Sequence, residues 1–430
     1  MLNLLLDLTS VMKTVGYVLL AFVVLMVMVL IHETGHYAAG KLLGFQINEF
    51  AVGMGPKILS KKKKNGEVFS LRLLPLGGFC AFEGEKEDVD NPKAFHKQKP
   101  WKRLIVLFSG ALFNFVSAIL IAIIVFAAYG ETVVVVNNVY DYAPTANQEL
   151  KSGDVIYKVN GRRVYMLDTL GRYFTDGEMT VTVLRDVDGD GKYEQVTLEG
   201  ITQDTFTPVI FTKVSGDFTS VDGERKLKAN DIIYTINGEF VCKSGDFTRL
   251  LSASDENIEL VVTDGQNYYQ YKINKSDFGS SLVAEDQASY TGIGMSVHYD
   301  KYKFGFGEVL IRVVPYCCEV GMLVLRTLGG LLTGAVGIES VGGPISTITM
   351  TTQVVSTGFA NVLMLIVLIS VNLAVFNLLP VPALDGCQMV FVIIEWIAKK
   401  PINRKVQSYI NGIGLIVLIV LMLLIDILKL

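Results

Sequence analysis

Three ionisable residues lie close together within an apolar part of the sequence. The stretch HETGH at residues 32–36 spaces His32 and His36 so that, on a helix, both side chains lie on one face, one turn apart. Two imidazoles in this arrangement can bind one zinc ion, and Glu33 beside them can take a proton from a metal-bound water. The alternative is a pair of buried, hydrogen-bonded histidines without a metal. We favour the metal site, because ionisable groups at membrane depth are costly and usually functional.

A catalytic zinc site needs a third protein ligand and an open position for water. The sequence NLLPVPALDG at residues 377–386 offers Asp385. Pro380 and Pro382 interrupt a helix within an apolar stretch, and a membrane tolerates such a break only where backbone is buried in protein or lines a wet cavity. The alternative is that Asp385 caps a helix beginning near Gly386. In a chain that also contains HETGH, we favour Asp385 as the metal ligand.

Membrane helices are the elements that would position these residues. The chain has 430 residues, of which 51% are hydrophobic and 19% charged, and it is therefore too apolar for an ordinary soluble enzyme. Four stretches can approach or span a hydrocarbon core about 30 Å thick: Val15 to Ile31, Leu104 to Tyr129, Val362 to Leu379, and Ile410 to Leu428. The first runs directly into HETGH without a small-residue cleavage site, so we expect a permanent helix and not a cleaved signal peptide.

Local charge predicts how the chain is oriented. Residues 41–103 contain thirteen Lys and Arg, whereas the segment before the first helix contains only Lys13. The positive-inside rule places that loop in the cytoplasm, and the basic cluster at 399–405 agrees. Both termini and residues 131–358 are then expected outside. The net charge of −4 offers no global basic field for nucleic acid, and the five scattered cysteines indicate no disulfide framework.

An internal repeat lies between the second and third apolar stretches. LKSGDVIYKVNGRRV at 150–164 aligns with LKANDIIYTINGEFV at 227–241. Each copy has a polar turn, a β-branched strand and an Asn-Gly hairpin turn, which predicts two small β-rich domains in tandem. The pattern resembles PDZ domains, which bind extended peptides at a sheet edge. The second copy has Asn230 where the first has Gly153.

Two further segments each have two interpretations. Four lysines at 61–64, followed by Asn65 and Gly66, predict a hairpin tip between short strands, and the same lysines could contact anionic lipids. Residues 304–332 mix apolar positions with charges near one side of a helix. They predict either an amphipathic helix at the outer membrane surface or an ordinary helix packed on the outer β-rich domains above it.

Taken together, these motifs resemble the site-2 protease family of intramembrane zinc metalloproteases, and the tandem PDZ-like insert resembles its bacterial regulator-of-sigma-E branch. The resemblance covers nearly the whole chain. It includes GMGP at 53–56 and PLGGF at 75–79, which are similar to the family's membrane-associated β-hairpin loop. SGALFNF at 109–115 is similar to its second-span motif, with Ala111 in place of a usual proline. VGGPIS at 341–346 is similar to the segment before its third span.

The resemblance implies residue roles and substrates. It implies zinc on His32, His36 and Asp385, with Glu33 as the catalytic glutamate. It also implies that three further residues position an unwound substrate segment: Asn372, Asn377 and Pro380. The implied activity is regulated intramembrane proteolysis of single-span membrane substrates, such as an anti-sigma factor or signal-peptide remnants, after a first cut outside the bacterial cell membrane.

The predicted fold is a polytopic α-helical membrane protein with about four transmembrane helices, a cytoplasmic-side β-hairpin loop and a tandem PDZ-like α+β extracytoplasmic insert. Its predicted divisions are the first transmembrane helix (1–40), the hairpin loop (41–103), the second helix (104–130), two PDZ-like domains (131–204 and 205–300), an amphipathic helix with a linker (301–358), the third transmembrane segment (359–398), and a basic loop with the fourth helix (399–430). The alternative function is a catalytically idle PDZ-type membrane scaffold; intact HETGH and LDG argue against it. A transporter would show inverted repeats between the spans, and we find none.

Overall fold

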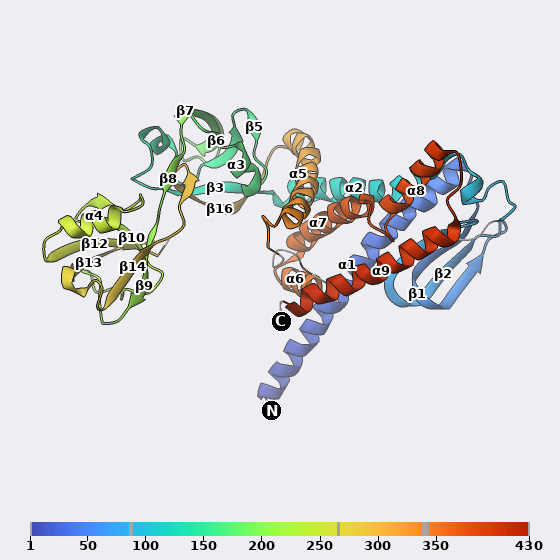
Figure 1. Ribbon diagram of the computed structural model, residues 1–430, viewed down its shortest axis with the longest axis horizontal. Helices are drawn as coiled ribbons and strands as arrows, with labels where there is room; N and C mark the ends of the chain where they lie inside the picture. Colours follow the sequence, from blue (N-terminus) through green and yellow to red (C-terminus); the bar gives the residue numbers. More distant parts are fainter. Residues whose placement is uncertain (1, 86–88, 265–266, 338–341, 343, 429–430) are drawn as a thin grey trace. The chain divides into compact units, whose positions relative to one another are not determined.

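The computed structural model describes residues 2–85, 89–264, 267–337, 342 and 344–428, and the chain divides into two compact units (Figure 1). Unit 1 combines Met1–Glu131 with Lys303–Leu430, and unit 2 is Thr132–Tyr302. Unit 2 is therefore inserted in the sequence between the two halves of unit 1.

Helices dominate unit 1: α1 (Leu2–Leu43), α2 (Pro100–Tyr129), α5 (Phe306–Thr333), α6 (Pro344–Ser356), α7 (Phe359–Leu378), α8 (Asp385–Ala398) and α9 (Arg404–Leu428). Within the described residues, four are long and apolar enough to cross a membrane: Val15–Leu43, Pro100–Tyr129, Phe359–Leu378 and Lys405–Asp426. The four long apolar helices that the sequence predicts are therefore present. Helix α2 packs against both α1 and α7 along its length.

Helices α1 and α2 approach each other closely where the HETGH motif lies. A Cβ atom on Gly35 would lie only 2.3 Å from the carbonyl oxygen of Ser109, so only glycine fits there. Helix α2 starts at Pro100, a residue suited to a first helical turn because it lacks an N–H that would have no partner there. It ends at Gly130, whose φ of 87° few other residues adopt readily.

The predicted proline break is present. Helix α7 ends at Leu378 and α8 begins at Asp385, with Pro380 and Pro382 in the link between them. Residues 341 and 343 of the VGGPIS segment lie outside the described residues. Helix α6 (Pro344–Ser356) begins within the segment, at its proline.

The hairpin predicted around the four lysines is present as β1 (Ile47–Lys62) and β2 (Val68–Phe82). Each strand bends, so its two halves pair separately. Residues 47–52 lie between residues 78–82 on one side and residues 68–71 on the other, and residues 57–62 pair with residues 68–72. The resulting order leaves 78–82 at one edge of the sheet, on the side of α1, with which β2 packs.

Helix α5 corresponds to the amphipathic segment predicted at 304–332, but its charges do not all face outward. Arg312 is only 1% exposed and forms a bidentate ion pair with Glu131, at 2.6 and 2.7 Å. The buried face of α5 packs on the helices α2 and α7 of unit 1, a contact that neither interpretation had predicted. The spacing of charges alone missed this, because a guanidinium can be buried when a carboxylate pairs with two of its N–H groups at once.

Two six-stranded sheets form most of unit 2. The first has the order β16-β3-β4-β6-β7, with β5 beside β4, and the second has the order β13-β12-β10-β9-β14, with β11 beside β10. A small third sheet pairs β8 with β15. The strands of the first sheet are β3 (Glu131–Val139), β4 (Val155–Val159), β5 (Arg162–Arg163), β6 (Met179–Asp186), β7 (Tyr193–Ile201) and β16 (Met295–Tyr302). Those of the other two are β8 (Asp204–Phe206), β9 (Val209–Val214), β10 (Ile232–Ile236), β11 (Glu239–Phe240), β12 (Asn257–Thr263), β13 (Tyr268–Asn274), β14 (Leu282–Asp286) and β15 (Tyr290–Gly292).

The repeated sequences fold alike. Asp154 and Asp231 are both buried, and each accepts the backbone N–H three residues earlier at 2.8 Å and binds an arginine. Each repeat then continues through its short strand into one helix, α3 (Leu167–Tyr173) or α4 (Asp246–Ala253). Asn230 adopts a φ of 71°, in the same left-handed region as the Gly153 it replaces.

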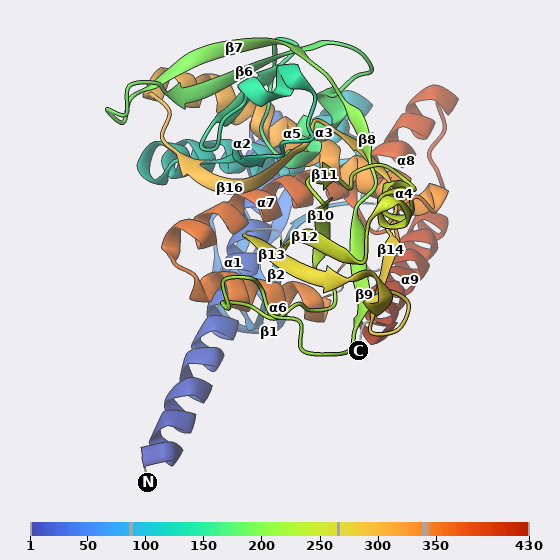
Figure 2. The same cartoon turned by 90° about the vertical axis from the view of Figure 1, so that its left-hand side faces the viewer.

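The structure differs from the predicted division at 204/205. Strand β16, at Met295–Tyr302, returns from the second repeat to the edge of the first sheet beside β3 (Figure 1). Figure 2 shows β16 away from β12 and β13 of the second sheet. Its residues Met295 and Val297 pack on the first core. A division by sequence order could not show this, because strand pairing between distant segments leaves no local signal.

Candidate metal centre

The three predicted metal ligands meet within unit 1. The Oδ2 atom of Asp385 lies 2.9 Å from His32 Nε2 and 3.3 Å from His36 Nε2, and the two Nε2 atoms lie 3.0 Å apart. Within the described part of the chain, this is the one cluster of histidine, cysteine and carboxylate side chains with metal-binding spacing. Helix α1 and the start of α8 thus converge on one point.

Each imidazole is oriented through its other nitrogen. His36 Nδ1 donates to the carbonyl oxygen of Val106 in α2 at 2.8 Å, which leaves Nε2 with a free lone pair directed at the cluster. His32 Nδ1 lies 3.5 Å from the side-chain amide of Asn114, also in α2 and fully buried. Both histidines are therefore held by the second span.

The Asn114 amide provides a test of whether a metal fits. With its Nδ2 toward His32, its buried Oδ1 has no hydrogen-bond partner among the described residues. The two ends of an amide are assigned from the bonds they make. Turned by 180°, Oδ1 accepts a hydrogen bond from the His32 Nδ1–H, and Nε2 is then the unprotonated nitrogen that a metal requires. The Asn114 Oδ1 atom therefore gains a hydrogen-bond partner only when His32 is protonated on Nδ1, which is the tautomer that binds a metal through Nε2.

Space and ligand separations agree with zinc. A Cβ on Gly110 would lie 2.5 Å from His36 Nε2 and 2.7 Å from His32 Nε2, so any side chain there would crowd the position between the two nitrogens. Tetrahedral zinc with nitrogen and oxygen ligands at 2.0–2.2 Å separates its ligand atoms by about 3.3 Å. The observed separations of 2.9 to 3.3 Å are close to that value.

Helix α9 supports the link that carries Asp385. Ala383 has a φ of 75°, unusual for a residue with a side chain, and its N–H donates to Asn411 Oδ1 at 3.2 Å. Gly414 in the same helix lies against Pro382, where a Cβ would approach it to 2.1 Å. Asp385 itself is the first residue of α8 and makes no capping hydrogen bond, so its carboxylate faces the histidines instead of capping its own helix.

Glu33 lies next to the cluster on α1 and is half-buried. Its Oε2 accepts the backbone N–H of Cys80 at 2.9 Å. Cys80 belongs to the edge segment 78–82 of the hairpin sheet, so the carboxylate is held between α1 and a sheet edge. Because the Cys80 N–H occupies Oε2, the other oxygen of Glu33, Oε1, is the one available to take up and release a proton.

The other predicted site residues lie near the break and outside the three-residue cluster. Asn372 and Asn377 are half-buried in α7, and Pro380 is exposed in the link that follows. Sequence reasoning did not assign roles to Asn114, Gly110 or Asn411. The first two lie in the SGALFNF stretch that was singled out as a span motif, which was the available signal; Asn411 had none.

Comparison with known proteins agrees with this geometry. Residues 20–421 match peptidase family M50. The chain belongs to peptidase family M50. This membership confirms the predicted family and enzyme class, a membrane metalloprotease of the site-2 type.

Several bacterial relatives carry the name "Putative zinc metalloprotease", which agrees with zinc as the predicted metal. A relative from Vibrio cholerae is 28% identical, with 92% of this chain and 94% of that protein covered. One from Clostridium perfringens is 27% identical, with 96% and 97% covered, and one from Agrobacterium fabrum is 24% identical, with 95% and 93% covered. The similarity extends through both units.

Proposed function

We propose that this M50 peptidase is a zinc-dependent endopeptidase that cuts single-span membrane proteins within the bilayer, with the metal on His32, His36 and Asp385. The convergence of three ligand atoms, two from α1 and one from the first residue of α8, is the observation that carries the proposal. The binding-only scaffold has no such observation in its favour, because an idle site has no need to orient both imidazoles through Val106 and Asn114.

The chemistry assigned to each group follows from its contacts. Zinc, when bound, polarises the scissile carbonyl and lowers the pKa of a water to about 7. Glu33 takes the proton of that water on Oε1 and passes it to the departing amine, while the Cys80 N–H fixes Oε2. Asn114 and Val106 hold the two imidazoles in place throughout.

A helical substrate must be unwound before its peptide bond is accessible, and we assign that role to the hairpin sheet. Segment 78–82 is an edge strand next to Glu33, and an extended substrate can pair with such an edge. Asn372, Asn377 and Pro380 would contact the same unwound segment from the α7 side.

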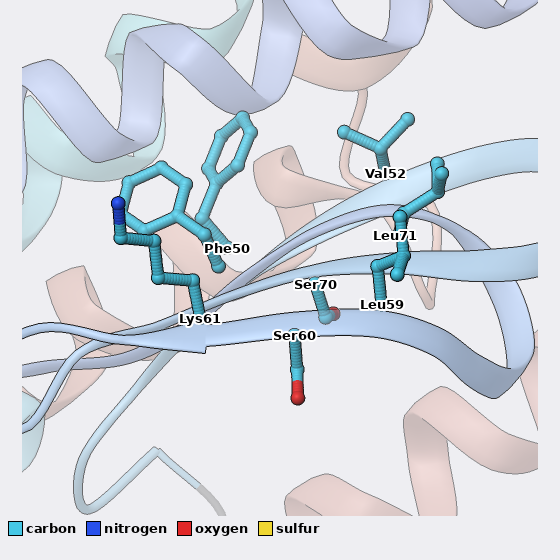
Figure 3. A pocket seen from close by; sticks show the side chains of 8 residues that line it. Phe50, Val52, Leu59, Ser60, Lys61, Ser70 and Leu71 are labelled. Carbon is cyan, nitrogen blue, oxygen red and sulfur yellow. The ribbon is translucent and has the colours of Figure 1, made fainter.

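The hairpin sheet also has a membrane-facing character. Apolar side chains are exposed on both of its strands: Met54, Ile58, Leu59, Leu71, Leu73 and Leu74. A shallow apolar groove of about 360 Å³ lies on one face of the sheet, where Phe50 and Val52 point toward a helix (Figure 3). These features favour a sheet that dips into the lipid headgroup region.

The wider setting is also part of the proposal. The protein would lie in a bacterial cell membrane with residues 41–103 and 399–405 in the cytoplasm and unit 2 outside. Unit 2 would be a pair of PDZ-like domains, supported by the equivalent folding of its two repeats. The substrates would be single-span proteins such as an anti-sigma factor, or signal-peptide remnants, already shortened by an earlier cut outside.

Zinc content tests the proposed ligand set. Asp385→Ala should reduce bound zinc in the purified protein from about one equivalent to a small fraction, because two histidines alone leave the site incomplete. Elemental analysis measures this. Asp188→Ala, in an exposed turn of unit 2, serves as the matched control and should keep full zinc. A fully loaded, folded Asp385→Ala protein would overturn the ligand assignment.

Cysteine labelling tests the orientation. In a variant whose Cys242 and Cys318 are replaced by serine, a cysteine at Asn65 should resist an impermeant thiol reagent added to intact cells. A cysteine at Asp188 should react with it. The expectation follows from the excess of Lys and Arg in residues 41–103. The opposite labelling pattern would reverse the proposed topology.

Removal of unit 2 tests whether unit 2 acts as a size filter, that is, whether it keeps substrates with a large outer domain away from the metal centre. Replacing Thr132–Tyr302 with a short flexible linker should leave zinc binding intact, because all three ligands lie in unit 1. Cleavage of untrimmed substrates, which still carry their full outer domain, should rise. Cleavage of trimmed substrates, already shortened by the earlier cut, should change little. Slower cleavage of trimmed substrates would instead indicate that unit 2 delivers them, and unchanged rejection of untrimmed ones would exclude the filter.

A further inference from the structure

We propose that a polar pocket at the ends of α2, α8 and α9 binds the phosphate of an anionic phospholipid headgroup. The pocket has a volume of about 1150 Å³ and is formed by the segment before α2, the last turn of α8 and the link from α8 to α9. It is separate from the metal centre: none of its lining residues is a metal ligand.

A buried ion pair forms the base of the pocket. Arg103 and Glu395 are 5% and 7% exposed, and their nearest charged atoms lie 2.6 Å apart. The second oxygen of Glu395 accepts the backbone N–H of Ile402 and the side-chain amide of Gln407, both at 3.1 Å. These bonds fix the link from α8 to α9 against α2, so the pocket is preformed. They also fully engage the Glu395 carboxylate.

The rim of the pocket is cationic. Lys97, Lys399, Lys400 and Lys405 line it, and the only carboxylates among its described lining residues are Asp90 and Glu395. Asp90 is fully exposed and lies 3.5 Å from Lys97, an arrangement that water and salt screen strongly. With Glu395 occupied by Arg103, the lysines from the α8–α9 link retain a net positive charge. Such a pocket fits a phosphate group, as basic pockets between membrane helices do.

The tryptophans place this pocket at the depth of lipid phosphates. The chain has two tryptophans, and both are exposed next to lining residues: Trp101 follows Pro100 at the start of α2, and Trp396 follows Glu395 in α8. Tyr409 in the first turns of α9 is also exposed. Tryptophan and tyrosine concentrate at the membrane–water interface, with the headgroups. We therefore assign the phosphate to a lipid and not to a soluble metabolite.

Binding of short-chain lipids to the purified full-length protein in detergent tests this assignment. Native mass spectrometry or a thermal-shift titration would compare dioctanoyl phosphatidylglycerol, dioctanoyl phosphatidylcholine and glycerol phosphate. We expect phosphatidylglycerol to bind more tightly than the zwitterionic lipid, and glycerol phosphate to bind weakly. Because the readout is binding, the result is independent of whether the protein cuts the proposed substrates.

A charge-matched pair of variants locates the site. Lys399→Gln, Lys400→Gln and Lys405→Gln together should weaken phosphatidylglycerol binding about tenfold or more. Lys62→Gln, Lys63→Gln and Lys64→Gln remove the same charge from the hairpin tip and should change it less than twofold. If the triple variant does not fold, Lys400→Gln alone should still weaken binding measurably.

Three results would overturn the proposal. Equal loss in the hairpin variant would mean that lipid responds to total charge and not to the pocket. Unchanged binding in the pocket variants would exclude the site. Glycerol phosphate binding as tightly as the lipid, and lost in the pocket variants, would make the ligand a soluble phosphate compound.

Discussion

Glu33→Gln is expected to abolish proteolysis while zinc stays bound at the wild-type level. The amide retains the size of the side chain but cannot accept the proton of the attacking water, so the rate should fall by at least about 10²- to 10⁴-fold. The three ligand atoms and the Cys80 N–H that orients residue 33 are unchanged. Cleavage of a single-span substrate in proteoliposomes and zinc content of the same preparation measure the two effects.

The control for Glu33→Gln is Glu199→Gln, the same chemical change on an exposed strand position of unit 2. It should cleave at the wild-type rate. If Glu33→Gln retained cleavage within about twofold of wild type, Glu33 would not be the general base. Loss of zinc together with activity would instead assign Glu33 a part in holding the centre together.

Asn114→Leu is expected to weaken zinc binding about 10- to 100-fold, the usual effect of removing the partner of a metal-bound histidine. Leucine has nearly the size of asparagine but offers no acceptor for His32 Nδ1, so the tautomer that presents Nε2 is no longer favoured. Competition with a chelator of known affinity gives the dissociation constant directly, without reference to catalysis.

Ser117→Ala is the matched control for Asn114→Leu. Ser117 lies one turn further along α2 and its hydroxyl bonds only to the Asn114 carbonyl of its own helix, so zinc affinity should be unchanged. An Asn114→Leu affinity within twofold of wild type would show that α2 orients His32 by packing alone.

The parts of the site that the sequence predicted are those with local signals. The spacing of His32 and His36 predicts a shared helix face, and the two prolines before Asp385 predict the break that frees its carboxylate. Asn411 could not be predicted, because its partner Ala383 is defined by backbone geometry and not by residue type. The same limit applies to β16, whose partner strand lies far away in the sequence.

Charge patterning was the least reliable signal. In α5 the charges predicted a solvent-exposed side of the helix, yet Arg312 is buried and paired with Glu131. This partner lies 181 residues earlier in the chain. Periodicity describes one helix at a time and contains no information about a carboxylate supplied by another segment. In contrast, the β-branched strands and Asn-Gly turns of the repeats predicted their strands well, since hairpin turns are encoded by adjacent residues.

The Arg312–Glu131 ion pair lies where the chain passes between the two units. Glu131 is the last residue before unit 2, and Phe304 lies two residues after the end of unit 2. The Arg312 guanidinium contacts both: it forms an ion pair with the Glu131 carboxylate and lies 4.3 Å from the centroid of the Phe304 ring. The two strands of chain that leave and rejoin the membrane helices are thus clasped by one side chain on α5. A force applied to unit 2 would therefore reach α2 and α5 through this ion pair.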